Sequence, residues 1–195
     1  MSKEKNNISI VIHGRGGQGA VTACEIIAEA AFLSGNFVDV HAYPSFGAER
    51  RGAPIQAYAK LSRKDKIWDR SQITNPDIII VFDQTVLNPQ IASSIKKNGI
   101  VIINSEKEPE YFVDKYNLSE VKLFVADISS YSLEKDFTID GAPVVNTPIL
   151  GLLAKALPDL SLENLIKIIT QRMDKELADL NIDLMKQGYN LAKTQ

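Results

Sequence analysis

The chain has 195 residues, of which 45% are hydrophobic and 24% are charged, and its formal net charge at pH 7 is −2. A chain of this size can bury a substantial core as one domain. We therefore expect a single domain over residues 1–195, with residues 160–195 as a helical C-terminal extension. The slightly negative charge provides no basic field for a polyanion, which argues against nucleic-acid binding.

The cysteine and hydropathy content restrict cofactors and compartment. Cys24 is the only cysteine, so this chain alone forms neither an intrachain disulfide nor a zinc or iron–sulfur cluster. No apolar run approaches the ~20 residues that span a bilayer, and residues 1–7 are polar and charged without the longer apolar core of a signal peptide behind them. These features predict a cytoplasmic protein that does not contact a membrane.

Runs of β-branched residues alternate with helical patterns along the chain. Strands are expected over residues 8–12, 37–42, 55–61, 78–82, 100–103 and 122–126, and helices over 18–33, 85–97, 147–157, 162–173 and 175–191. The alternation predicts an α/β fold, a mostly parallel sheet with crossover helices in a Rossmann-like arrangement, and a helical C-terminal tail. Residues 111–140 are the least regular part, and the strand at 122–126 is the one element predicted there.

Apolar patterns distinguish the individual elements. Residues 78–82 are apolar at every position, which is typical of a central parallel strand. Residues 55–61 alternate between apolar and polar side chains, so this strand should lie at an edge or run antiparallel. The helix at 18–33 is apolar except for a narrow stripe that includes Glu25 and Glu29, which predicts a buried crossover helix.

A glycine-rich turn lies between the strand at 8–12 and the helix at 18–33. It contains Gly14, Arg15, Gly16, Gly17, Gln18 and Gly19. A strand, a tight turn and a helix start together form an anion-binding geometry, and three of these glycines have the spacing of the dinucleotide fingerprint. That fingerprint also requires an acidic residue at the end of the second strand, but the nearest one, Asp39, lies inside that strand. The turn is therefore only a weak indication of NAD binding. The alternatives are a site for another phosphate group and a turn whose glycines only allow close packing.

A second motif, the loop at 43–54, carries Glu49, Arg50 and Arg51 between two glycines and two prolines. A loop between strands that is restricted by glycines and prolines in this way is usually positioned to contact a ligand or another protein. One arginine can pair with Glu49 while the other reaches a phosphate, a carboxylate or a partner protein. The alternative is a loop held by its own ion pairs.

Several polar residues outside these motifs allow either a ligand-binding or a structural role. Asp83 and Asp127 follow apolar strands, where α/β sheets gather ligands, but both can also be caps. Asn146 precedes the helix at 147–157, and capping is its favoured role. His13 and His41 have no Ser, Cys or carboxylate at the spacing of a triad or a metal motif, so we interpret both as structural. The sequence contains no recognisable catalytic or metal-binding constellation.

The two glycine motifs resemble those of the gamma subunits of the 2-oxoacid:ferredoxin oxidoreductase family. The resemblance continues through Asn75-Pro76-Asp77 and Val145-Asn146-Thr147-Pro148-Ile149-Leu150-Gly151, so it spans most of the chain. The run Glu49-Arg50-Arg51-Gly52-Ala53-Pro54 is most similar to the pyruvate branch, pyruvate:ferredoxin oxidoreductase or pyruvate synthase.

This resemblance implies an enzyme that converts pyruvate and coenzyme A to acetyl-CoA and CO2 and passes electrons to ferredoxin. It places thiamine diphosphate and magnesium in alpha and beta subunits and 4Fe-4S clusters in beta and delta subunits, with no cofactor bound by this chain alone. Contacts with coenzyme A or with other subunits are expected at Gly14, Arg15, Gly16, Gly17, Gln18, Gly19, Glu49, Arg50, Arg51 and Asn146. Two other functions stay open, namely an independent nucleotide-binding module and a purely structural scaffold subunit.

Overall fold

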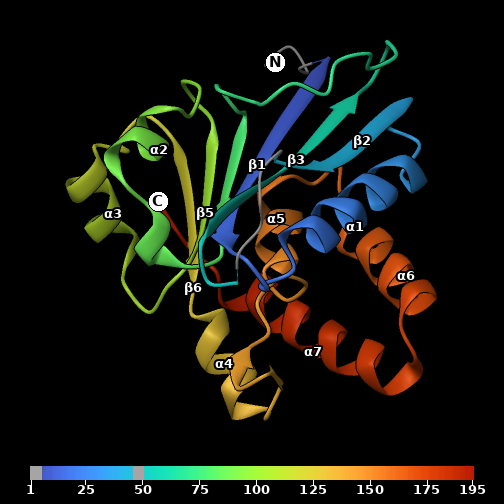
Figure 1. The fold of residues 1–195 in the computed structure, drawn as a ribbon, viewed down its shortest axis with the longest axis vertical. Helices are drawn as coiled ribbons and strands as arrows, with labels where there is room; N and C mark the ends of the chain where they lie inside the picture. Colours follow the sequence, from blue (N-terminus) through green and yellow to red (C-terminus); the bar gives the residue numbers. More distant parts are fainter. Residues whose placement is uncertain (1–5, 46–50) are drawn as a thin grey trace.

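The computed structural model describes residues 6–45 and 51–195. Its centre is a seven-stranded sheet with the strand order β2-β3-β1-β4-β5-β6-β9 (Figure 1). The strands are β1 (Asn7–Arg15), β2 (Asp39–Pro44), β3 (Pro54–Ser62), β4 (Ile78–Val81), β5 (Ile100–Asn104), β6 (Lys122–Ala126) and β9 (Lys193–Thr194). β7 (Thr138–Ile139) and β8 (Ala142–Pro143) form a separate two-stranded hairpin.

Four adjacent strands, β1, β4, β5 and β6, run parallel and form the predicted α/β core. β4 is buried at every position, as its continuous apolar run predicts. The predicted antiparallel strand at 55–61 is confirmed as β3, which pairs antiparallel with both β1 and β2. β3 does not lie at an edge, because β2 covers its free side and β9 forms the opposite edge.

Helices cover both faces of the sheet. They are α1 (Ala20–Leu33), α2 (Pro89–Ser93), α3 (Pro109–Tyr116), α4 (Ile128–Glu134), α5 (Leu150–Ala156), α6 (Leu162–Arg172) and α7 (Lys175–Leu191). Ile78 and Ile80 of β4 pack into the core beneath α1, α5, α6 and α7, whereas Ile79 and Val81 pack with α2 and α3. Because successive side chains of β4 point to opposite faces of the sheet, this one strand contributes to the hydrophobic core on both faces.

Two predicted helices differ from the observed ones. The helix predicted at 85–97 is a 3₁₀ turn (Gln84–Val86) followed by the short α2. Pro89 causes the break, because the residue before a proline avoids the helical region; Asn88 has φ −140° and its side chain caps α2 by accepting from the Ile91 amide. The helix predicted at 147–157 begins only at Leu150. In the irregular stretch 111–140 the structure contains most of α3, then β6, α4 and the start of the β7–β8 hairpin.

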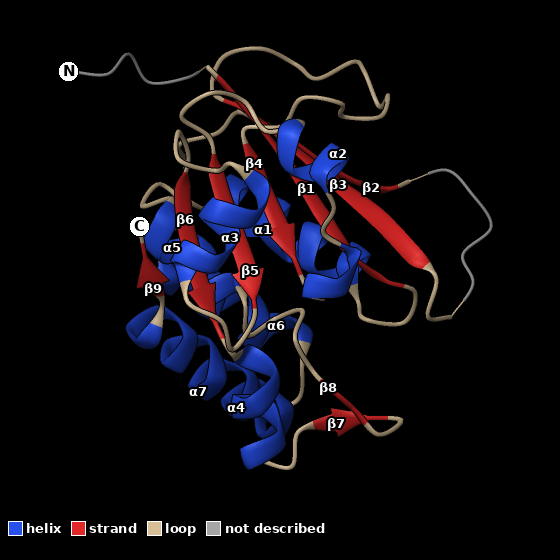
Figure 2. Cartoon of the chain, turned by 90° about the vertical axis from the view of Figure 1, so that its left-hand side faces the viewer, coloured by secondary structure: helices blue, strands red, loops and turns tan. Residues whose placement is uncertain are grey.

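The predicted C-terminal helices are confirmed as α6 and α7. Arg172 at the end of α6 binds Glu25 at 3.1 Å and Glu29 at 2.7 Å, so the polar stripe of α1 is a contact surface between helices. After α7 the chain returns to the sheet, where β9 lies beside β6 (Figure 2). The last elements are thus packed into the same sheet and core as the first.

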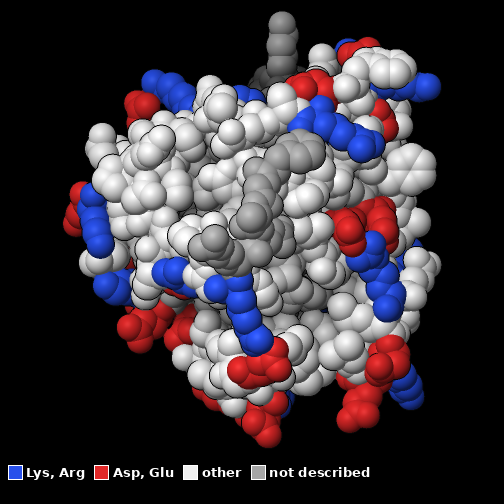
Figure 3. Space-filling view, viewed as in Figure 1, with Lys and Arg blue, Asp and Glu red and all other residues white. Residues whose placement is uncertain are grey.

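The surface carries both signs of charge. Lysine and arginine side chains alternate with acidic ones on the face shown in Figure 3. Across residues 6–45 and 51–195, no helix has the length and apolar character needed to cross a membrane.

Candidate functional site

The glycine-rich turn lies where β1 ends and α1 begins. β1 extends to Arg15, three residues beyond the predicted strand, and α1 starts at Ala20. Gly17 and Gly19 have φ values of 97° and 74°, which glycine adopts without steric cost. Gly19 is the N-cap of α1, makes no side-chain cap, and no acidic residue lies in the first turn. The first amides of α1 are therefore available to an anion.

The second motif joins this turn through the backbone. The Gly16 amide donates to the Ala53 carbonyl at 2.9 Å, and the Gly52 amide donates to the Gly16 carbonyl at 3.0 Å. Arg15 Nη1 also donates to the Gly52 carbonyl at 3.0 Å. The two motifs that stand out in the sequence are thus neighbours in space. Glu49 and Arg50 lie outside the described residues.

All three guanidinium nitrogens of Arg15 donate hydrogen bonds at this end of the sheet. Its Nε donates to Asp83 at 2.6 Å, and its Nη2 donates to the Thr85 hydroxyl at 2.6 Å. Burial raises the pKa of Asp83, but hydrogen bonds from the Thr85 hydroxyl and amide and from Arg15 outweigh it and hold the pKa below its ordinary value. Asp83 therefore caps the 3₁₀ turn Gln84–Val86 and pairs with Arg15. Arg15 in this way links the end of β1 to the segment that follows β4.

Gln18 and Asn146 shape the turn from either side. Gln18 Oε1 accepts from the Arg15 amide at 2.7 Å, which closes the turn. Asn146 packs against Gly19 so closely that a Cβ at residue 19 would overlap the amide nitrogen of Asn146. The favoured capping role of Asn146 is wrong, since the N-cap of α5 is Ile149. Its amide lies against the start of α1 instead.

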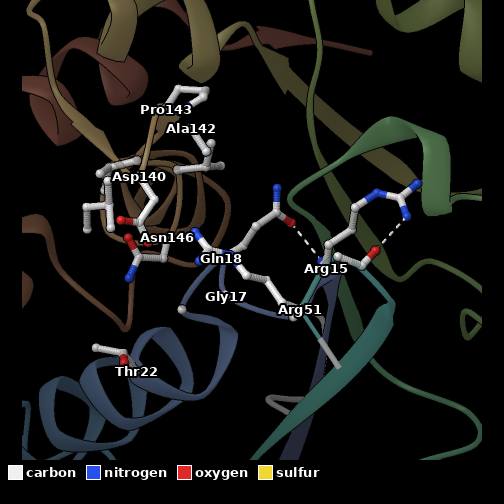
Figure 4. Close-up of a pocket in the computed structure, with 15 residues that line it drawn as sticks. Arg15, Gly17, Gln18, Thr22, Arg51, Asp140, Ala142, Pro143 and Asn146 are labelled. Carbon is white, nitrogen blue, oxygen red and sulfur yellow. Dashed lines mark hydrogen bonds and ion pairs between the residues drawn. The ribbon is translucent and has the colours of Figure 1, made fainter. Parts of the chain in front are cut away.

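A pocket of about 740 Å³ opens over this turn. Its walls are residues 15–19 and Thr22 on one side, Arg51 and Gly52 on another, and the β7–β8 hairpin with residues 144–146 on a third (Figure 4). Arg51 Nη2 and Asp140 Oδ2 form an ion pair at 2.6 Å between two of these walls. The structure therefore brings Arg15, Gly16, Gly17, Gln18, Gly19, Arg51 and Asn146 to one pocket.

Sequence reasoning missed the hairpin that forms the third wall. Ile139, Asp140, Ala142 and Pro143 all line the pocket. The dipeptide Asp140-Gly141 between two short runs is a strong hairpin signal, and both residues have positive φ, 51° and 78°. That signal could have located the hairpin, although not the pocket beside it.

The remaining candidates make contacts within the fold. His13 is buried, and desolvation lowers its pKa to about 4, so the ring is neutral. Arg70 Nε donates to His41 Nδ1 at 3.3 Å. Asp127 caps α4 by accepting from the Ser130 amide at 3.0 Å. Within the described part of the chain, no three His, Cys, Asp or Glu side chains gather in a group that could hold a metal ion.

Comparison with known proteins identifies the family. Residues 9–191 match the family described as pyruvate ferredoxin/flavodoxin oxidoreductase, a span that contains both glycine motifs and the whole pocket. The chain belongs to this family. The resemblance seen in the sequence is thereby confirmed.

Relatives match along nearly the whole chain. The pyruvate/ketoisovalerate oxidoreductases common subunit gamma of Pyrococcus furiosus is 40% identical, over 93% of this chain and 95% of its own. The pyruvate synthase subunit PorC of Methanocaldococcus jannaschii is 39% identical, over 94% and 96%. The crystal structure of pyruvate oxidoreductase subunit PORC from Thermotoga maritima has 32% identity and a TM-score of 0.81, over 98% of this chain and 99% of that one. The α/β fold predicted from the sequence is the fold of this relative.

Proposed function

We propose that this chain is the gamma subunit of a cytoplasmic pyruvate:ferredoxin oxidoreductase, which converts pyruvate and coenzyme A to acetyl-CoA and CO2 and reduces ferredoxin. The proposal is supported by two relatives, 40% and 39% identical over almost their full length, which are named pyruvate/ketoisovalerate oxidoreductases common subunit gamma and pyruvate synthase subunit PorC. Alpha, beta and delta subunits would supply thiamine diphosphate, magnesium and the 4Fe-4S clusters. Cys24 is a poor cluster ligand, because burial raises the pKa of its thiol and favours the protonated form.

We further propose that the pocket above the glycine turn binds the phosphate groups of coenzyme A. The observation that carries this proposal is the uncapped start of α1, which opens into a pocket that also holds the exposed guanidinium of Arg51. Helix amides and an arginine are a favourable combination for a pyrophosphate. The volume, about 740 Å³, lies within the range of small-molecule and cofactor sites.

The independent nucleotide-binding alternative is disfavoured by the position of Asp39. This residue begins β2, and its β3 partner Ser62 also pairs with Asn7 at the start of β1. The carboxylate therefore lies at the opposite end of the sheet from the glycine turn. There it accepts a hydrogen bond from the Ile67 amide at 2.6 Å. A ribose bound beside that turn would not meet it.

Arginine variants of the assembled complex test the coenzyme A site. Arg51→Ala and Arg50→Ala should each raise the KM for coenzyme A about ten- to hundredfold, the equivalent of about 1.5–3 kcal/mol for a lost charge-assisted contact. The KM for pyruvate should hardly change. Arg70→Ala is the control, because Arg70 is exposed but does not line the pocket.

Other outcomes of this experiment identify the competing functions. If the variants release the chain from the complex on size-exclusion chromatography while the remaining complex has normal kinetics, the arginines serve a subunit interface. If assembly and kinetics are both unchanged in the double variant, the arginines contact neither coenzyme A nor a partner subunit, and the alternative of a loop held by its own ion pairs is correct. Micromolar NAD affinity of the separate chain in calorimetry would instead favour the nucleotide-binding module.

A further inference from the structure

The Arg51–Asp140 ion pair crosses the proposed anion site from one wall to another. Arg51 lies just before β3, and Asp140 lies at the tip of the β7–β8 hairpin, almost ninety residues further along the chain. Both side chains are largely exposed, 75% for Arg51 and 64% for Asp140. An exposed ion pair is weak, so an anion that enters the pocket can replace the carboxylate.

The two arginines of the pocket differ in this respect. Arg15 is held by Asp83, Thr85 and the Gly52 carbonyl, and its charge is paired on the far side of the turn. The ion pair of Arg51 is with a residue of the pocket wall itself. Arg51 is therefore the pocket cation whose partner a ligand can exchange.

The hairpin holds the Asp140 carboxylate at this position. Thr138 pairs with Pro143 and Ile139 with Ala142, and the hairpin is not part of the seven-stranded sheet (Figure 2). Its base is anchored by Phe137 and Val144, which pack with Leu184 of α7. The tip therefore projects from a fixed base toward Arg51.

We propose that Asp140 is an internal competitor for Arg51 and sets the affinity of the pocket for coenzyme A. The carboxylate neutralises Arg51 before the ligand binds and gives up the guanidinium to a phosphate group on binding. This inference rests on the proposed function of the pocket. It assigns to Asp140 a role in substrate affinity, because a carboxylate beside Arg51 weakens the binding of any polyanion there.

The Asp140→Asn variant tests this competition, and Asp136→Asn is a closely matched control. Both aspartates are exposed and have positive φ, 51° and 54°, a region in which asparagine is also well tolerated. Asp136 does not line the pocket. Calorimetric titration of coenzyme A into the assembled complex, without pyruvate, should show a Kd about two- to fivefold lower for Asp140→Asn. The Kd of Asp136→Asn should equal that of the wild type.

The same two aspartate variants in an Arg51→Ala background show whether Asp140 acts through Arg51. There, Asp140→Asn should leave the Kd unchanged. Equal tightening with and without Arg51 would overturn the proposal, and so would an unchanged Kd for Asp140→Asn when Arg51→Ala alone weakens binding. If Arg51→Ala itself has no effect on the Kd, the coenzyme A assignment fails and the competitor role fails with it.

Discussion

Gly19 combines two separate constraints at the start of α1. Its φ of 74° is costly for a residue such as alanine, and its missing side chain leaves room for Asn146. Gly35 has the same backbone conformation, φ 73°, but nothing lies within 4 Å of a Cβ built there. A comparison of substitutions at the two positions therefore distinguishes the cost of backbone strain from the cost of steric overlap.

We expect Gly35→Ala to lower the free energy of unfolding by about 1 kcal/mol, the cost of a left-handed alanine. Gly19→Ala should cost about 1 kcal/mol more, because Asn146 must also move. Urea unfolding followed by circular dichroism measures both. Equal losses for the two variants would mean that Asn146 rotates away without cost.

His13 should make the stability of the protein depend on pH. Its pKa is lowered by burial from 6.5 to about 4, so between these values the unfolded chain binds more protons at this residue than the native protein does. The free energy of unfolding should consequently decrease as the pH falls from 6.5 to 4, by about 3 kcal/mol from this group.

The His13→Gln variant removes this titration and keeps a polar side chain beside Gln56. Its free energy of unfolding should fall less steeply over the same pH range, as measured by urea unfolding at several pH values. His41→Gln is the control and should retain the steep dependence. A His13→Gln curve parallel to that of the wild type would contradict the assignment of this acid sensitivity to His13.

At the scale of elements, α5 and α7 approach each other closely at Gly151. A Cβ at Gly151 would overlap the Met185 carbonyl and lie 2.8 Å from the Tyr189 amide nitrogen, both backbone atoms of α7. At Gly188 in α7, a Cβ would lie 3.0 Å from side-chain tips of Ile128 and Leu152 and 3.2 Å from the Pro148 carbonyl oxygen, so its nearest backbone neighbour is much less crowded than at Gly151. Backbone cannot yield as side-chain tips can.

Gly151→Ala should therefore destabilise the protein by about 3 kcal/mol, because the two helices must separate. Gly188→Ala should change stability by less than about 1 kcal/mol, since the higher helix propensity of alanine offsets a small repacking cost. Thermal and urea unfolding of the two variants test the difference. A loss at Gly188 as large as the loss at Gly151 would show that both sites are equally rigid.

For the whole molecule, we predict that the chain purified without partners folds but carries no iron and no thiamine diphosphate, and does not decarboxylate pyruvate. The thiol of Cys24 is buried in α1, and the described residues offer no clustered metal ligands. Ultraviolet–visible spectra, metal analysis and an activity assay measure these properties, with the assembled complex as the positive control. Iron in stoichiometric amount in the separate chain would contradict the prediction.

Long-range ion pairs explain why the sequence predicts the roles of some polar residues only in part. Glu25 and Glu29 predict a polar stripe on α1, but nothing near them in sequence indicates that Arg172 binds both. Asp83 could be expected to cap or to bind a ligand, and its pairing with Arg15 depends on β1 and β4 being adjacent and parallel. Local sequence restricts such side chains to a few roles, and the partner across the fold selects one.

The sequence by itself determined the elements with a strong local signal. Runs of β-branched residues predicted the parallel strands, helical patterns predicted α6 and α7, and two glycine motifs indicated the turn and the family. These properties arise from contacts and backbone preferences within a few residues. Pro89 was also such a local signal, and the helix predicted through it was wrong.

Only the tertiary structure decided how the proposed site is assembled. It placed β3 inside the sheet, joined Gly16 to Gly52 and Ala53, and brought the hairpin tip at Asp140 to Arg51. It also paired Arg15 with Asp83 and Arg51 with Asp140 of the pocket wall, and we propose that a ligand replaces only the second of these partners. The physical reason is that strand order and ion pairing join residues that are distant in the chain. Each local segment is compatible with several partners, and the packed sheet permits only one of them.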